Sequence, residues 1–173
     1  LSSGSKFFKN EINCNLKGKY SSAFVNGIFS INNDKHHEIR SIINHLTENT
    51  KSYQLIKSVL EDGSKAVYQG KIFVNSDAQK TDGYQLSKAI LLNKNSEFNA
   101  KPELEIYADD VKCSHGSASG SLNEDSIFYL MSRGLNYNQS RELLINGFLL
   151  DVVEKITDPE IKNLIKNMIG IKE

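Results

Sequence analysis

The pattern of the sequence changes near Ser121, and this change constrains the fold more than any other feature. Up to that residue, short apolar and β-branched runs alternate with clusters of turn-forming residues, which is typical of β-strands. Such runs occur at residues 11–16, 71–74 and 103–107. Beyond Ser121, apolar residues recur at helical spacing between capping residues. The chain is therefore predicted to be mostly β, with a helical tail.

The strand-like runs do not by themselves select one β architecture. They are spaced by roughly 8 to 12 residues, an interval typical of a sandwich, a barrel or a coil. A parallel β-helix would show self-similarity at a fixed period, and no strict repeat is visible. The residues alone predict a mostly β region and leave its architecture open.

Three helices are predicted in the tail, each introduced by a capping residue. They are 124–133 after Asn123, about 139–156 after Asn138, and a helix that begins at Pro159 after Asp158 and ends at Gly170. In the third helix the apolar residues form one stripe, which indicates a single buried face. In the second helix they lie almost all round, so this helix must be covered on more than one side by the β region, by another chain, or by both.

Composition and motifs exclude several functional classes. The chain has 21 Lys and Arg against 21 Asp and Glu, so it offers no excess positive charge to nucleic acid or to an anionic membrane. No apolar run approaches the roughly 18 to 20 residues of a membrane-spanning helix. The sequence also lacks a Walker A loop, G-x-G-x-x-G, G-x-S-x-G, H-E-x-x-H and C-x-x-C. We therefore expect neither nucleic-acid nor membrane partners.

The densest group of potentially reactive side chains lies at residues 106–117. If the segment is extended, Cys113 and His115 point to the same face, about 6.6 Å apart along the strand. A thiolate and an imidazole suit zinc, copper or iron bound with sulfide. Two ligands do not complete a tetrahedral site, and the other cysteine, Cys14, is remote in sequence. The pair is either a half-site that another subunit completes, or a buried thiol beside a solvent-facing imidazole.

The other histidines and a pair of acids are interpreted as structural. His36 and His37 are adjacent, so in a strand they face opposite ways and cannot chelate one ion together. His45 is predicted to face solvent. Asp109 and Asp110 are predicted to form a turn between strands.

Three segments carry a family resemblance: Lys80-Thr-Asp-Gly83, residues 101–116 and Ile127-Phe-Tyr-Leu-Met-Ser-Arg-Gly134. Together they resemble the SufB/SufD family of the SUF iron–sulfur cluster assembly system, and the C-terminal part of its SufD branch in particular. The SufB branch lacks the Lys-Cys-Ser-His-Gly string and has a cluster-building cysteine in an earlier strand, whereas residues 85–92 contain none here. A weaker likeness covers nearly the whole chain.

The resemblance implies an architecture of two domains. Residues 1–121 would form a right-handed parallel β-helix, and residues 122–173 a C-terminal α-helical domain. It further implies that the β-helix is N-terminally truncated here, and that a helical region precedes it in the complete family members.

The resemblance also implies a function, that of a non-catalytic scaffold subunit in the cytoplasm. Such a subunit would pair with SufB through the β-helices and bind the ATPase SufC through the C-terminal helices, supporting iron acquisition and cluster formation. His115 would be an interface residue and a candidate metal ligand shared with SufB, with Cys113 beside it. Candidates for contact with SufC are Leu144, Phe148 and Val152. No cofactor would be tightly bound in isolation, and iron or an iron–sulfur cluster would be present only transiently in the complex.

An enzyme is the alternative interpretation, either a β-helix protein that acts on polysaccharide or a Cys/His enzyme that acts on a small molecule. Polysaccharide-active β-helices typically gather acids with arginine or calcium ligands on one face, and this chain has only three arginines. A Cys/His hydrolase would need Cys113 as a nucleophile with a lowered pKa.

Overall fold

The computed structural model describes residues 1–171, in which eight strands are followed by three helices. The strands are β1 (Phe7–Leu16), β2 (Ser22–Ile31), β3 (His36–His45), β4 (Lys51–Leu60), β5 (Lys65–Val74), β6 (Thr81–Leu91), β7 (Glu97–Ile106) and β8 (Val111–Gly120). The helices are α1 (Glu124–Ser132), α2 (Tyr137–Val153) and α3 (Pro159–Met168). The last two residues of the helical domain predicted for residues 122–173 lie outside the described residues.

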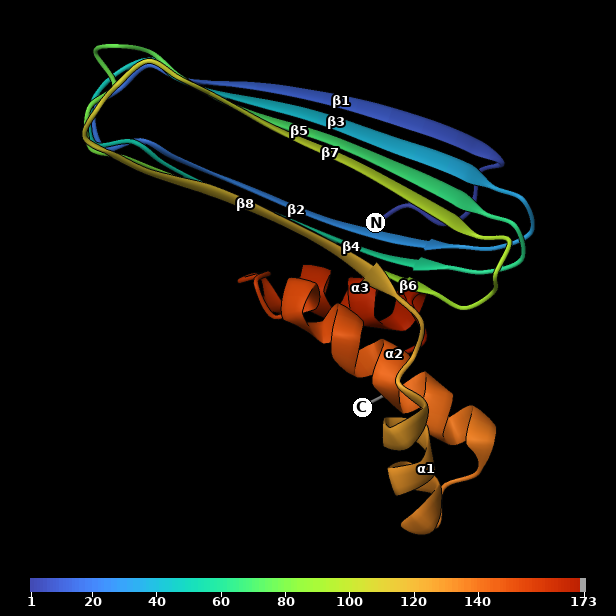
Figure 1. The fold of residues 1–173 in the computed structure, drawn as a ribbon. Helices are drawn as coiled ribbons and strands as arrows, with labels where there is room; N and C mark the ends of the chain where they lie inside the picture. The colour runs from blue at the N-terminus through green and yellow to red at the C-terminus, as the bar shows by residue number, and fades with distance from the viewer. Residues whose placement is uncertain (172–173) are drawn as a thin grey trace.

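Successive strands alternate between two parallel sheets, so the chain winds as a flattened coil (Figure 1). The first sheet has the order β1-β3-β5-β7 and the second sheet the order β2-β4-β6-β8. Each strand from β1 to β6 pairs with the strand about 30 residues further on, as Phe7 does with His36 and Lys51 with Asp82. The parallel β-helix followed by helices is therefore confirmed.

The strands are longer and more widely spaced than the sequence pattern indicated. Most have ten residues, and they begin about 15 residues apart rather than 8 to 12. The reason is that polar residues occupy the outward positions of the strands, where they look like turn residues. Asn13, Asn15 and Asn44 are examples, because the Asn44 amide donates hydrogen bonds to both of the others across β1 and β3.

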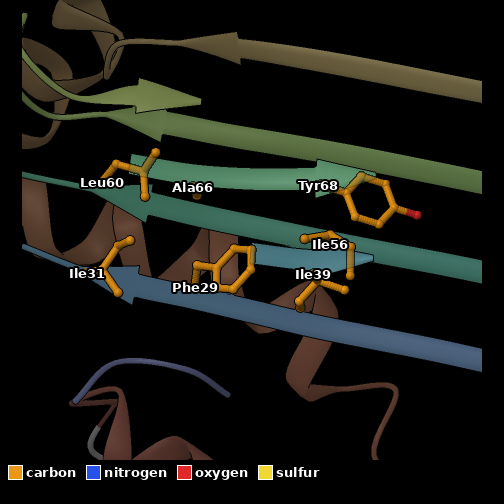
Figure 2. Packing of buried hydrophobic residues seen from close by; sticks show 7 residues of the cluster. All are labelled: Phe29, Ile31, Ile39, Ile56, Leu60, Ala66 and Tyr68. Atoms are coloured by element: carbon orange, nitrogen blue, oxygen red, sulfur yellow. The ribbon is translucent and has the colours of Figure 1, made fainter. Parts of the chain in front are cut away.

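Alternate residues of each strand face the inside of the coil and form its core. Figure 2 shows one cluster in which side chains from both sheets pack together: Phe29, Ile31, Ile39, Ile56, Leu60, Ala66 and Tyr68. Burying each large apolar side chain contributes roughly 1.5 to 3 kcal/mol. The two sheets are therefore held face to face mainly by this interior.

The interior also contains a polar group of side chains. The Ser41 hydroxyl donates to Gln54 Oε1 at 2.5 Å, and the Tyr68 hydroxyl donates to the same oxygen at 3.3 Å. Gly70 lies beside them, and a Cβ at this position would collide with the Tyr68 hydroxyl and with Gln85 Oε1. Only glycine leaves the space that this buried group occupies.

His45 is buried, and the prediction that it faces solvent is wrong. Its side chain is 0% exposed, and its ring nitrogens are hydrogen-bonded to Thr50 Oγ1 at 2.7 Å and Ser52 Oγ at 2.9 Å. Burial lowers the pKa of His45 to about 4, although the charge of Asp82 acts in the opposite direction. The prediction failed because hydroxyl groups inside the coil satisfy the hydrogen-bonding capacity of the imidazole. These hydroxyl groups come from the following turn and strand, which the local pattern around His45 does not show.

His36 and His37 face opposite sides of β3, as predicted. His37 is fully buried, with its ring hydrogen-bonded to Ser2 Oγ and to the Ser5 carbonyl, both at 2.7 Å. His36 lies on the outer face beside Glu38. The two rings therefore cannot meet at one ion.

The helix caps agree with the sequence except at α2. Asn123 caps α1 and Asp158 caps α3, with Pro159 in the first turn. At α2 the cap is Asn136, not Asn138, because the Asn136 side chain accepts from the Gln139 backbone while the Gln139 side chain accepts from the Asn136 backbone. Because of this reciprocal pair, α2 begins at Tyr137, two residues before the predicted start.

Helix α2 lies on the outer face of the second sheet (Figure 1). The buried residues of this contact are Ile28, Leu55 and Val59 from the strands and Leu149, Val152 and Val153 from α2. Ile165 of α3 and Ile169, the residue directly after α3, pack against the same cluster. Among the described residues, no helix combines the length and the apolar character needed to cross a membrane.

Candidate functional site

Cys113 and His115 lie on β8, the outermost strand of the second sheet at the last coil. Cys113 is in register with Gly83 and His115 with Gln85, and both of these β6 residues are buried inside the coil. Residues in register on neighbouring parallel strands share a face. The two side chains therefore point to the same side, as the sequence predicted, and this side is the inner side of the coil.

The two side chains differ in their surroundings. Cys113 is half-buried beside a cluster that includes Ile72 and Val74, and a Cβ at Gly83 would lie only 3.3 Å from its Sγ. Burial raises the pKa of the Cys113 thiol, and a backbone hydrogen bond from Gly83 opposes this only in part. His115 is exposed. The site thus presents an accessible imidazole beside a thiol that is protonated at neutral pH.

A raised pKa is the opposite of what a cysteine nucleophile needs. A Cys/His hydrolase therefore gains no support from the geometry at Cys113. In the part of the chain that is described, no three His, Cys, Asp or Glu side chains come together in a way that could hold a metal ion.

Charged residues surround the beginning of β8. A hollow of about 390 Å³ is lined there by Lys51, Lys80, Thr81, Asp82, Asp110, Val111 and Lys112. Asp109 and Asp110 form the bend between β7 and β8, as predicted. Asp110 is held in place by its backbone, because its N–H donates to Gln79 Oε1 and its carbonyl accepts from the Lys80 N–H.

A second, larger hollow was not identified from the sequence. It measures about 680 Å³ and is lined by Phe24, Asn26, Lys51, Ser52, Tyr53, Asp82, Tyr84, Lys155 and Thr157. Tyr53 and Tyr84 stack there with ring centroids 5.3 Å apart. Phe24, Tyr53 and Tyr84 are in register across β2, β4 and β6. These aromatic residues lie about 30 positions apart in the sequence, so the row can be recognised only when the period of the coil is known.

The three helical residues predicted to contact a partner differ in exposure. Leu144 and Phe148 are half-buried, whereas Val152 is only 3% exposed and packs against the second sheet. Val152 is therefore a core residue in this chain and cannot offer its side chain to another protein. The β region covers one side of α2, which is one of the alternatives that the all-round apolar pattern allowed.

The sequence did not single out the apolar residues that the helices expose most. These are Phe128, Tyr129 and Met131 of α1, Tyr137 and Leu143 of α2, and Ile161, Leu164 and Met168 of α3. In α3 the predicted stripe is divided, because Ile165 and Ile169 pack inward while Leu164 and Met168 stay more than half exposed. Large exposed apolar patches often mark protein interfaces.

Comparison with known proteins places this geometry in one family. Residues 1–148 match the family described as "SUF system FeS cluster assembly, SufBD core domain". The chain is 34% identical over 167 residues to the iron–sulfur cluster assembly protein SufD of Escherichia coli K12, covering 96% of this chain and 40% of that protein. It is 42% identical over 117 residues to protein ABCI7, chloroplastic, of Arabidopsis thaliana, covering 67% of this chain and 25% of that protein. An iron–sulfur cluster assembly SufBD family protein of Synechocystis is 37% identical over 119 residues, covering 69% and 26%. The chain thus spans less than half the length of each of these relatives.

Proposed function

The chain belongs to the SufBD family of the SUF iron–sulfur cluster assembly system, and we propose that it is a SufD-like scaffold subunit of that system. A part in iron–sulfur cluster assembly follows from the family. The proposal adds that the subunit is non-catalytic, pairs with SufB, binds the ATPase SufC and works in the cytoplasm. Both cysteines are free, which suits a reducing compartment.

The difference between the two strand edges of the last coil supports pairing with SufB through β8. The exposed edge of β7 carries Lys101, Pro102 and Glu103, and such residues discourage pairing with another strand. The β8 sequence from Cys113 to Gly120 consists of small residues apart from His115. An edge of this kind readily accepts a further strand. The observation that carries the proposal is that the exposed His115 lies on this unprotected edge.

At such an interface His115 would act as one ligand for iron, the substrate of assembly. The described residues supply no complete metal site around it, so the remaining ligands would come from SufB. Imidazole and thiolate are both suitable iron ligands, but the raised pKa of Cys113 makes it the weaker ligand until a metal or partner displaces its proton. We propose no tightly bound cofactor in the isolated subunit, and only a transient iron or iron–sulfur cluster in the complex.

The exposed apolar residues of the helices support an interface with SufC. Phe128 and Tyr129 on α1 and Leu164 and Met168 on α3 are all more than half exposed. Leu144 and Phe148, half-buried on α2, would lie at the margin of this surface. A protein partner that covers these residues would remove apolar area from water, which is the main driving force of association.

Substitution of His115 tests the site. His115→Ala in the full-length protein, co-expressed with SufB and SufC, is expected to leave the three-component complex intact and to lower cluster formation, because an iron ligand is removed. His36→Ala is the matched control, since His36 lies on the outer face of β3, which belongs to the first sheet, whereas β8 belongs to the second sheet. Normal cluster yield from His115→Ala would remove this residue from the site. Failure of the unsubstituted protein to be retained with SufB and SufC would refute the scaffold proposal itself.

A further inference from the structure

Lys57 is a buried cation that ties α2 to strand β4. It lies on the outer face of β4 and is only 3% exposed. Its Nζ donates to the Phe148 carbonyl oxygen at 2.6 Å and to Asp151 Oδ2 at 2.5 Å, and it lies 4.5 Å from the centre of the Phe148 ring. Asp151 is largely exposed, and the hydrogen bond from Lys57 is the main reason why its pKa is lowered. One ammonium group thus holds both backbone and side chain of the helix.

A second ion pair ties the beginning of the same helix to the end of the same strand. Arg141, in the second turn of α2, pairs with Glu61, the residue directly after β4. Both partners are about two-thirds buried. Arg141 is one of only three arginines in the chain, and this pair uses one of them.

The spacings of the two ties match. Ten residues of helix separate Arg141 from Asp151, which is about 15 Å at the usual rise. Four residues of extended chain separate Lys57 from Glu61, which is about 13 Å. The beginning of α2 is paired with the end of β4, so helix and strand run in opposite directions. The similar lengths allow both pairs to form at once, which fixes the helix at two points. The helix cannot slide or pivot on the sheet without separating one of the pairs.

Stability alone does not explain why a lysine occupies this position. The surroundings are apolar, since Leu55 and Val59 flank Lys57 on the same face of β4 and belong to the cluster under α2. A well-packed apolar residue is often at least as stabilising as a buried ion pair at such a place. What the ion pair adds is a directional contact that fixes one position of the helix on the sheet.

We propose that the Lys57–Asp151 and Glu61–Arg141 pairs are coupling contacts, which transmit movement of the helices to the second sheet and so to β8. This inference rests on the proposed function, in which the helices bind SufC and β8 carries the assembly site. The path through the sheet is short, because Lys57 is in register with Lys88 on β6 and Lys88 with Ala118 on β8. Lys57 is thus a positioning residue that acts on His115 through the strands between them.

Lys57→Met in the full-length protein tests the coupling. Methionine keeps the length and apolar stem of lysine, and the exposed Asp151 can return to water. We expect SufB and SufC to be retained and ATP hydrolysis by SufC to be unchanged, while cluster formation per ATP hydrolysed falls about fivefold or more. Lys65→Met is the matched control, since Lys65 is an exposed, ion-paired lysine on β5 of the first sheet, which does not contact α2, and it should leave all three quantities unchanged.

Two variants at the exposed end of the pair keep the test informative if Lys57→Met fails to fold. Asp151→Ala should uncouple ATP hydrolysis from cluster formation, and Asp151→Asn should largely restore it, because the amide oxygen can still accept from Lys57. Equal loss of complex retention, ATPase activity and cluster formation in Asp151→Ala would indicate a merely structural contact and overturn the proposal. So would normal cluster formation in both Lys57→Met and Asp151→Ala.

Hydrogen exchange separates this inference from the proposed function. In the protein without partners, Lys57→Met should speed amide exchange in α2 while leaving β4 protected, because the helix gains freedom on an intact sheet. Unchanged exchange in α2 would overturn the coupling inference even if the SUF complex forms. Loss of the complex with the unsubstituted protein would instead refute the proposed function.

Discussion

His45 shows how a single side chain inside the coil makes stability depend on pH. Its pKa falls from an ordinary value of 6.5 to about 4 in the folded protein. The folded state therefore keeps the ring neutral at pH values where the unfolded chain binds a proton. Stability should be constant above pH 6.5 and decrease as the pH falls toward 4. Between pH 7.5 and pH 5 we expect a loss of about 2 kcal/mol, measurable from urea unfolding curves.

His45→Gln is the control for this prediction. Glutamine keeps a hydrogen-bonding group near Thr50 and Ser52 but does not titrate. The variant should therefore show a much smaller change between the two pH values, whatever its stability at pH 7.5. Carboxylates with lowered pKa values, such as Asp151 and Glu154, act mainly below this pH range. An unchanged pH dependence in His45→Gln would assign the effect to other groups.

Some features of individual residues could be predicted from the sequence and others could not. The shared face of Cys113 and His115 follows from strand alternation, which is a local property. Which face was the inner one did not follow, because it depends on the residues in register on β6, about 30 positions earlier. The burial of His45 escaped prediction for the same reason. A polar residue is tolerated inside when its partners are brought there by the fold.

At the scale of elements, α2 has one face in the core and one face available to a partner. Leu149 is 1% exposed and packs on the second sheet, whereas Leu143 is 51% exposed. Leu149→Ala should lower the free energy of unfolding by about 2 to 5 kcal/mol, because it leaves a cavity between helix and sheet. Leu143→Ala should change stability by less than about 0.5 kcal/mol and should weaken binding to SufC.

Denaturant unfolding and a SufC pull-down with both variants distinguish the two faces. Equal destabilisation by both substitutions would mean that Leu143 is covered within the chain. Undiminished SufC binding by Leu143→Ala would move the interface away from this part of α2 and toward α1 and α3.

The helices were more predictable from the sequence than the strands. Helix caps are local, so Asn123 and Asp158 could be assigned from their neighbours alone. The start of α2 was missed because two asparagines, Asn136 and Asn138, both suit a cap, and the Gln139 side chain decides between them. The all-round apolar pattern predicted cover on more than one side, and the structure shows the side that the β region covers. It could not indicate which residues face the sheet, because that depends on the contact of α2 with β4.

At the scale of the whole molecule, the last coil has one edge open to pairing. Ser114→Lys places a charged side chain on the outer face of β8, where Ser114 is exposed. Charged residues on an edge strand oppose pairing, so this variant should bind SufB more weakly, by about tenfold, while folding normally. Ten-fold corresponds to about 1.4 kcal/mol, within the range of effects at interface residues. Size-exclusion chromatography and titration of SufB measure this effect.

Asn99→Lys is the corresponding change on β7, where Asn99 is exposed on the outer face. This edge already carries Lys101 and Pro102, so the substitution should leave SufB binding unchanged. Weaker binding by Asn99→Lys with normal binding by Ser114→Lys would place the interface on the first sheet instead of the second.

The architecture as a whole was the least accessible from residue patterns. A coil repeats its backbone about every 30 residues, but its turns differ in length and its inner positions accept serine, glutamine and histidine as well as isoleucine. The period is therefore clear in the register of the paired strands but hardly visible in the amino-acid sequence. Family resemblance supplied what periodicity did not, and the sheet order agrees with it.

The register of the strands also allows a sequential order of folding. Every long pairing joins a strand to the one about a single turn before it, so a nascent chain can fold as it leaves the ribosome, each turn serving as the template for the next. Strand β8 is the final one to be added. When the chain folds in this order, Cys113 and His115 take their places only after the turns beneath them exist. A chain interrupted during synthesis would lack the strand that carries His115, the proposed iron ligand.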